Sequence, residues 1–241
     1  LGVDIGGDGA GTHLHVEAVG VDGIARRTQG VAHGGRELAL TVGACGSPSE
    51  EAETAATQSA PPAAEGGVEI VADALPTDLE SAVNAEWRGE RSERDNWRNP
   101  AATLEALGVD PSGTVMEIWP GGGWYADILM PWINGNGGTY VAAHFPVEGS
   151  SENRVRSRER FVERYSNTDR YGNYVLAAFD NNTGEMVEPG SADTILTFRN
   201  VHNFMMGNYA EKAFDDFYMA LREGGTLGVV DHRLPSTRER Y

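Results

Sequence analysis

Short apolar segments alternate with helix-patterned segments throughout residues 68–241. Turn-forming Gly, Asn, Asp and Pro residues separate the apolar segments from their neighbours. Strands that alternate with helices pair in parallel, because each helix carries the chain back across the sheet. The pattern therefore predicts an α/β fold, a doubly wound and mostly parallel sheet with helices on both faces. The expected strands are 114–120, 139–145, 173–179, 226–233 and part of 191–204, and the expected helices are 76–97, 99–109, 124–133, 150–167 and 209–225.

The charge balance of the chain restricts its partners. The 241 residues carry a formal net charge of −17. Phosphate backbones repel such a chain, so we expect a small-molecule substrate and no nucleic acid. The segment 87–98 holds Arg91, Arg94 and Arg98 among acidic residues, which predicts a solvated helix face. A lid, or a site for a substrate carboxylate, is the alternative for these arginines.

The N-terminal part of the chain differs from the rest in its sequence pattern. Residues 1–35 show neither helical nor strand periodicity, which predicts that they lie outside the folded domain. A stretch rich in Ser, Glu, Ala and Pro follows and is too polar to pack. We therefore expect a leader or non-domain segment at 1–44, a flexible polar linker at 45–67 and the folded domain at 68–241.

The single cysteine, Cys45, excludes an intrachain disulfide. The small residues Val42, Gly43 and Ala44 precede it, and this run resembles the lipobox of bacterial lipoprotein signal peptides. The resemblance implies that Cys45 is lipidated and attaches an exported protein to a membrane of the bacterial cell envelope. The alternative is an incidental cysteine in a cytoplasmic protein.

Three glycines, Gly121 to Gly123, follow the expected strand 114–120. Ligands of parallel sheets bind at the carboxyl ends of the strands, where bare backbone lets N–H groups approach an anion or a ribose. Dinucleotides and S-adenosylmethionine are the two cofactor classes that use such a loop. A dinucleotide site expects an acidic residue at the end of the second strand, where this chain has His144. The glycines alone leave both classes open.

Three motifs in order resemble those of class I S-adenosylmethionine-dependent methyltransferases over residues 95–233. Residues 117–123 are similar to the family's E/D-x-G-x-G-x-G motif, with Trp119 in place of the first glycine. Residues 192–203 are similar to its fourth strand, and residues 220–231 to its next helix-to-strand passage. More narrowly, the chain resembles bacterial methyltransferases with a PGGGWY motif. The resemblance implies S-adenosylmethionine as the cofactor and methyl transfer as the reaction.

The same resemblance assigns roles to individual residues. Asn200 and His202 follow the fourth strand and are the expected catalytic residues, with His202 as the base because histidine titrates near ~6.5 when unperturbed. Glu117 is expected to bind the cofactor's amino group, and His144 stands where many members hold the ribose with an acid. No metal is expected, because the histidines show no ligand spacing. The expected cofactor-binding residues are Glu117, Pro120, Gly121, Gly122, Gly123, Trp124, His144, Asp180 and Asn200.

Two other functions stay open at this point. A dinucleotide-dependent oxidoreductase would lack its usual ribose acid and a Tyr-x-x-x-Lys pair, since Tyr209 and Lys212 are three positions apart. An exported lipoprotein would meet little S-adenosylmethionine, so its methyltransferase-like domain would be a non-catalytic binding module. The family's fold also adds an antiparallel strand pair after the fifth strand. Because the sequence stops at Tyr241, we expect these C-terminal strands to be missing from it.

Overall fold

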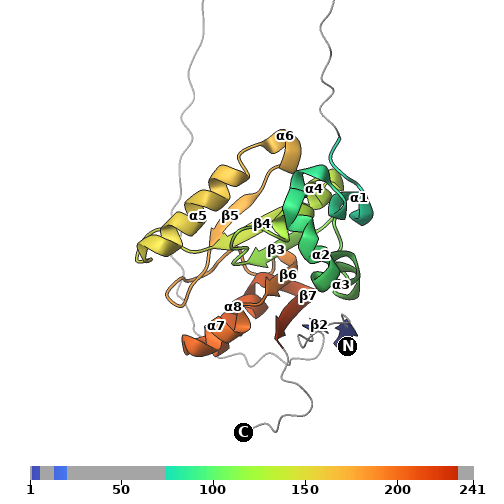
Figure 1. The fold of residues 1–241 in the computed structure, drawn as a ribbon. Coiled ribbons are helices and arrows are strands. Elements are labelled where there is room, and N and C mark those ends of the chain that lie inside the picture. The colour runs from blue at the N-terminus through green and yellow to red at the C-terminus, as the bar shows by residue number, and fades with distance from the viewer. Residues whose placement is uncertain (1, 6–13, 21–73, 233–241) are drawn as a thin grey trace, which may run out of the picture. The chain divides into compact units, whose positions relative to one another are not determined.

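The computed structural model describes residues 2–5, 14–20 and 74–232, which belong to one compact unit. Within these residues seven strands form one sheet in the order β1-β2-β7-β6-β3-β4-β5 (Figure 1). The lipobox-like run at Cys45 and the expected linker 45–67 lie outside the described residues. The strands are β1 (Gly2–Ile5), β2 (Leu14–Gly20), β3 (Thr114–Ile118), β4 (Thr139–His144), β5 (Val175–Ala178), β6 (Ala192–Phe198) and β7 (Leu221–His232). The helices are α1 (Leu79–Val83), the 3-10 helix η1 (Glu86–Arg94), α2 (Asp95–Arg98), α3 (Pro100–Ala106), α4 (Ala126–Gly135), α5 (Glu152–Arg164), α6 (Thr168–Tyr171), α7 (Val201–Met206) and α8 (Ala210–Ala220).

The strands β3 to β7 are parallel and confirm the doubly wound fold expected from the sequence. The first of them, β3, lies between β4 and β6, with Glu117 opposite Ala142 on one side and Leu196 on the other. From β3 the chain moves outward to β4 and β5, and then returns to β6 and β7 on the other side. The carboxyl ends of β3 and β6 therefore flank the point where the strand order reverses, which is where such sheets bind ligands.

The antiparallel pair β1 and β2 corrects one expectation from the sequence. Strand β2 pairs antiparallel with β7, with Leu14 opposite His232 and Gly20 opposite Thr226, and β1 pairs antiparallel with β2. The N-terminal stretch was expected to lie outside the domain, and for residues 2–5 and 14–20 this is wrong. The edge of β7 that suggested missing C-terminal strands is covered by β2.

The sheet separates two apolar cores, because alternate residues of a strand face opposite sides. In β3, Val115 packs with α1, α3, α4 and α6, whereas Met116 and Ile118 pack with α7 and α8. Figure 1 shows α4 and α8 on different sides of the sheet. The central strands β3, β4 and β6 are buried on both faces, which explains their continuous apolar sequences.

The single helix expected at 76–97 is wrong, because the segment forms three short elements. Asp78 caps α1 as its sequence suggests, accepting a 2.8 Å hydrogen bond from the backbone N–H of Ser81. The chain then bends at Gly89, whose φ of 48° and ψ of −135° are not helical. Asn99, with a φ of 41°, separates α2 from α3. The helical spacing of apolar residues does not reveal these breaks, so the sequence pattern predicts a longer helix than the structure has.

The helix expected at 209–225 ends earlier, at Ala220, and β7 begins at once with Leu221. Gly224, at a φ of 74°, lies in the irregular first part of β7, where the pairing with β6 shifts register between Ala192 and Thr194. The glycines therefore allow an irregular strand start and do not cap the helix. No helix in the described ranges is long and apolar enough to span a bilayer.

Candidate functional site

A cleft with a volume of about 820 Å³ opens at the carboxyl ends of β3 and β6. Its size lies within the range of pockets that bind small molecules, roughly 300–1,000 Å³. One wall is the loop after β3, a second is the end of β6, and η1 and α2 form a third. The lining residues are Glu90, Arg91, Glu93, Arg94, Trp97, Arg98, Glu117, Trp119, Pro120, Gly121, Gly122, Trp124, Tyr125, Phe198, Arg199, Asn200, His202 and Val230.

The loop after β3 needs left-handed backbone at three positions. Trp119, Gly121 and Gly123 have φ values of 48°, 58° and 77°. Trp119 therefore adopts a conformation that favours glycine, which is the residue the family motif has there. Its indole is buried among aromatic rings, with the Phe145 centroid 4.6 Å away, and its Nε1–H donates to the Phe179 carbonyl oxygen at 2.8 Å. These contacts offset the backbone strain.

The three glycines of this loop serve different structural roles. A Cβ on Gly123 would lie 2.1 Å from the Tyr165 hydroxyl, so this glycine permits packing inside the protein. Gly123 is not part of the cleft lining, although the sequence predicted it to bind the cofactor. Gly121 and Gly122 do line the cleft. A Cβ on Gly122 would meet no described atom within 4 Å, so the backbone of Gly122 is accessible from the cleft.

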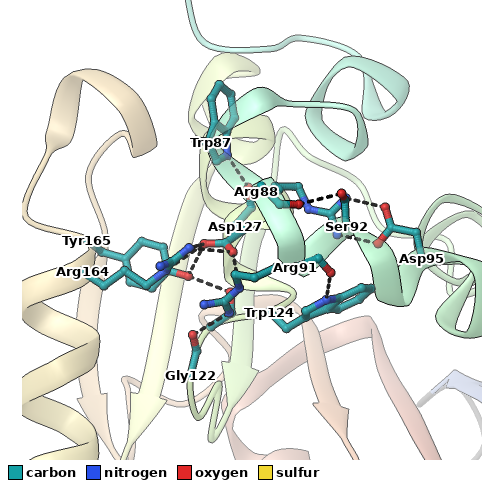
Figure 2. Close-up of polar contacts among 12 residues, drawn as sticks. Trp87, Arg88, Arg91, Ser92, Asp95, Gly122, Trp124, Asp127, Arg164 and Tyr165 are labelled. Atoms are coloured by element: carbon teal, nitrogen blue, oxygen red, sulfur yellow. Dashed lines mark hydrogen bonds and ion pairs between the residues drawn. The ribbon is translucent and has the colours of Figure 1, made fainter.

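A buried carboxylate, Asp127 in the first turn of α4, supports the loop from behind (Figure 2). Its oxygens lie 2.8 Å from Arg91 Nε, 3.0 Å from Arg164 and 2.7 Å from the Tyr165 hydroxyl. Arg91 also donates to the carbonyl oxygen of Gly122 at 2.6 Å. The helix η1 is thus connected to the glycine loop through the Arg91 guanidinium.

Glu117 is the most perturbed acid that faces the cleft. Its side chain is buried, with the residue 3% exposed, and it accepts a 2.6 Å hydrogen bond from the Tyr140 hydroxyl. Burial raises the pKa of Glu117 to about 7, while the hydrogen bond from Tyr140 acts in the opposite direction. A cationic ligand would stabilise the ionised form of a carboxyl group whose pKa lies near neutral pH.

Two aromatic residues fix the far end of the loop. Trp124 donates from Nε1 to the Arg91 carbonyl oxygen at 2.8 Å, and the Arg98 guanidinium stacks 4.5 Å above its ring centroid. Tyr125 stacks on Phe198, with 3.6 Å between the ring centroids. Both side chains also belong to the apolar core, so they serve packing and line the cleft at once.

Asn200 connects the ends of the two central strands. Its Nδ2 donates to the Ile118 carbonyl oxygen at 3.0 Å, which holds the start of α7 against the end of β3. The residue lines the cleft, as the sequence predicted, but its amide is engaged with backbone. This contact gives Asn200 a structural role in shaping the cleft.

His202 lies at the mouth of the cleft and contacts an acid from the neighbouring strand. Its Nδ1 is 3.1 Å from Asp231 Oδ1 at the end of β7. Asp231 also accepts hydrogen bonds from the backbone of Val201 and from His232. Burial opposes ionisation of Asp231, but the hydrogen bonds from His232 and His202 outweigh it and lower its pKa. A neutral His202 that donates from Nδ1 keeps Nε2 free as a proton acceptor.

The ring nitrogens of His202 and His232 and the Asp231 carboxylate lie within 4.8 Å of one another, a spacing that metal ligands also have. Arg199 lies 3.0 Å from His232 Nε2 and acts only as a donor. A neutral His232 must then carry its proton on Nδ1, the nitrogen that faces Asp231 at 2.9 Å. Hydrogen bonds from both rings to Asp231 therefore account for the short distances among these three side chains.

Two predicted cofactor contacts lie away from the cleft lining. His144 is fully buried, its Nδ1 accepts from the Phe145 N–H at 2.8 Å, and burial lowers its pKa to about 4. Asp180 forms a turn, accepting from the N–H groups of Asn182 and Thr183 at 2.8 and 2.9 Å. The structure brings Glu117, Pro120, Gly121, Gly122, Trp124, Asn200 and His202 together in the lining, and places Gly123, His144 and Asp180 outside it.

Sequence reasoning misses several residues that shape this site. Asp127 comes shortly after the glycine motif, and Arg164 lies in a polar helix. No sequence motif indicates that these two residues contact each other. Arg199 directly follows the end of β6. Residues directly after parallel strands are placed at the ligand-binding edge, so this position predicts a cleft residue.

Comparisons with known proteins find distant structural likenesses and no sequence match. No protein-family model matches the sequence, and no curated protein matches it either. Solved structures with a similar fold include one from Methanococcus maripaludis that is provisionally assigned as an S-adenosyl-L-methionine-dependent methyltransferase, at 15% identity and a TM-score of 0.42. The alignment covers 64% of this chain and 64% of that structure.

Two further structures of this kind are complexes. Coclaurine N-methyltransferase, bound to N-methylheliamine and SAH (S-adenosylhomocysteine), is 15% identical with a TM-score of 0.42, over 57% of this chain and 35% of its own. A SAH-bound methyltransferase from Podospora anserina is 16% identical with a TM-score of 0.34, over 64% and 62%. Likenesses this distant assign no activity, so a functional proposal must rest on the cleft of this chain.

Proposed function

We propose that this protein transfers a methyl group from S-adenosylmethionine to a small-molecule acceptor. The observation that carries the proposal is the pairing of bare backbone at Gly121 and Gly122 with the buried carboxyl of Glu117, on the cleft side of the central strand. Backbone N–H groups and one acid at this position suit a ligand with both hydroxyl groups and an ammonium group. The family resemblance of residues 117–123, 192–203 and 220–231 adds support.

The residues of the cleft fit the cofactor's chemistry. Glu117 would bind the ammonium group, because a cation beside a buried carboxyl restores the ionised form that burial disfavours. The loop Pro120 to Gly122 and the Trp124 side chain would enclose the remainder. When bound, S-adenosylmethionine supplies a methyl group on a positively charged sulfur. This methyl group is readily transferred to a nucleophile, and the sulfur is released as a neutral thioether.

The protein's own part in the reaction is positioning and proton removal. His202 would accept a proton at Nε2 from the acceptor's hydroxyl or amine. Asp231, 3.1 Å from His202 Nδ1, would hold the ring in that tautomer and stabilise its charge after proton transfer. Asn200 would keep this wall of the cleft in place through its hydrogen bond to the end of β3.

The proposed export of the protein through a lipidated Cys45 competes with this function. Processing before Cys45 would remove β1 and β2 and leave the edge of β7 uncovered. We therefore favour an unprocessed protein with Cys45 unmodified. Mass spectrometry of the protein from its native host tests this: an N-terminus at Cys45 carrying acyl chains would establish the lipoprotein and support a non-catalytic binding domain.

Calorimetric titration of S-adenosylmethionine and SAH into the full chain tests the cofactor, with NAD⁺ titrated in parallel. We expect micromolar binding of the first two and none of NAD⁺. Gly122→Val should weaken SAH binding at least about tenfold, because a side chain would enter the cleft. Gly184→Val is the matched control, since this glycine also has open space around it but lies outside the cleft lining. Absence of binding by the folded protein, or equal losses in both variants, would overturn the assignment.

A further inference from the structure

We propose that the methyl acceptor carries a negatively charged group, a carboxylate or a phosphate, which Arg98 and Arg199 bind with Arg94 at the edge of the cleft. This inference rests on the proposed function and adds the chemical class of the second substrate. Charge is unevenly distributed over the protein. The chain has a formal net charge of −17, yet four arginines converge on this one cleft.

Three of these arginines, Arg94, Arg98 and Arg199, have no carboxylate partner among the described residues, although Arg199 also lies 3.0 Å from His232 Nε2. In contrast, Arg91 is engaged with Asp127 and the Gly122 carbonyl. The nearby Arg88 shows how the same segment satisfies a guanidinium, since it pairs through two nitrogens with Asp95 at 2.6 and 2.7 Å.

The guanidinium of Arg98 is held in place before any ligand arrives. It stacks on Trp124, whose indole is itself anchored to the Arg91 backbone. Burial lowers the pKa of Arg98, and the positive charges of Arg199, Arg94 and Arg91 lower it further. Like charges so close to a half-buried guanidinium are unfavourable in the free protein, and an anion between them would relieve the repulsion.

The acids of the cleft do not cancel this positive region. Glu117 is buried and accepts from Tyr140, and its raised pKa leaves it only partly ionised near pH 7. Glu90 and Glu93 are exposed residues of η1, where water screens their charge. The ionised Asp231 is engaged by His202 and His232, so the acids near the cleft leave Arg98 and Arg199 able to attract an anion.

The surroundings suit an acceptor with an apolar body. The rings of Trp97, Trp124 and Phe198 line the cleft near the arginines, and Trp97 is 70% exposed. A guanidinium binds planar oxyanions through two parallel hydrogen bonds, and rings bury the attached hydrocarbon. His202 lines the same cleft and would meet the acceptor's nucleophilic atom.

The test uses benzoate and inorganic phosphate as probes and benzamide as a neutral match for benzoate. Each is titrated into the SAH-saturated full chain, and binding is followed by NMR. We expect benzoate to bind at least about tenfold more tightly than benzamide, and added NaCl to weaken it. Arg98→Gln and Arg199→Ala should each abolish the preference, whereas Arg156→Ala, an exposed arginine of α5, should keep it. Equal binding of benzoate and benzamide, or no binding of either anion, would overturn the proposal.

A second comparison separates acceptor from cofactor, because the cofactor also has a carboxylate. SAH and 5′-methylthioadenosine, which lacks the amino acid part, are titrated into the wild type and both variants. Unchanged SAH affinity in Arg98→Gln and Arg199→Ala supports an acceptor site. Weaker SAH binding with unchanged 5′-methylthioadenosine binding would assign the arginines to the cofactor and overturn the proposal. The anion titrations are repeated without SAH, so a failure of the proposed cofactor remains distinguishable from a failure of the anion site.

Discussion

The Arg91 guanidinium lies 2.8 Å from the Asp127 carboxylate and donates at 2.6 Å to the Gly122 carbonyl oxygen. One side chain therefore joins η1, the first turn of α4 and the glycine loop (Figure 2). The Asp127 carboxylate is fully buried and is the charge that balances both Arg91 and Arg164.

Replacing Asp127 with Asn should destabilise the protein by about 2–3 kcal/mol, because it leaves two partly buried guanidinium groups without a counter-charge. Both arginines are partly exposed, which keeps the cost at the low end for a broken buried pair. Urea unfolding measures the change. Glu159→Gln, an exposed acid of α5, is the control and should stay within about 0.5 kcal/mol of the wild type. Equal stability of the two variants would show that the Asp127 charge is dispensable.

Gly123 and Gly122 should respond differently to alanine. Gly123→Ala places a methyl group against Tyr165 at a φ of 77°, and we expect a loss of about 3 kcal/mol. Gly122→Ala meets open space and should change stability by less than about 0.5 kcal/mol while it weakens SAH binding. Thermal or urea unfolding and calorimetry measure the two effects. The reverse order of stabilities would contradict the role given to each glycine.

Glu117→Gln should change how stability depends on pH. The pKa of Glu117 is raised from 4.5 to about 7 in the folded protein, so the folded state binds the proton more tightly than the unfolded state. Its contribution is fully present below pH 4.5 and is lost as the pH rises through 7, by about 3 kcal/mol in total. Gln stays neutral and can still accept the Tyr140 hydrogen bond, so the variant should resemble the wild type at pH 5 and be more stable at pH 8.

Urea unfolding of both proteins between pH 5 and 8 measures this difference, with the exposed Glu105→Gln as the control. The same substitution should weaken SAH binding, because it removes the charge proposed to hold the ammonium group. If the free energy of unfolding depends on pH in the same way for the wild type and for Glu117→Gln, ionisation of the buried Glu117 carboxyl does not destabilise the folded protein.

The ring of His202 should carry its proton on Nδ1 at pH 8, and the ring of His144 on Nε2. The first donates to Asp231, whereas the second accepts at Nδ1 from the Phe145 N–H. Nitrogen chemical shifts of the two rings distinguish the tautomers within one spectrum. In Asp231→Leu, which has no acceptor, the His202 preference should disappear while the His144 signals stay in place. A His202 ring protonated on Nε2 in the wild type would remove its proposed function as a base.

Removing β2 should destabilise the domain far more than removing β1. A chain without residues 1–13 keeps β2 on the edge of β7, whereas a chain without residues 1–20 exposes that edge. An exposed strand edge pairs readily with other molecules, so the shorter chain should self-associate. Size-exclusion chromatography and urea unfolding compare the two. Identical behaviour would mean that β2 adds nothing to the sheet.

The sequence predicts the parallel half of the sheet well, because each strand is a local apolar run and each connection contains a helical pattern. It also brings Glu117, Asn200 and His202 to one place, since residues at the carboxyl ends of parallel strands meet at one edge. The same reasoning places His144 and Asp180 at that edge. It cannot decide whether a strand-end side chain enters the cleft, packs inside or forms a turn.

Other features escape the sequence for a different physical reason. The pairing of β2 with β7 depends on hydrogen bonds between segments that are far apart in the chain, and no local periodicity records it. The contact between Gly123 and Tyr165 is likewise invisible until α5 is placed beside the loop. In the segment 76–97, helical spacing continues across Gly89, although the backbone there does not remain helical.

The pairing of β2 with β7 also sets an order of events during synthesis. Residues 14–20 leave the ribosome long before residues 221–232, so β2 must wait for its partner while the intervening chain folds. Entropy adds little to this delay, because the cost of closing a loop grows only slowly with its length. Contacts between such distant segments nevertheless slow folding and leave a strand temporarily unpaired. The edge of β7 therefore stays uncovered until β2, one of the first segments made, pairs with it.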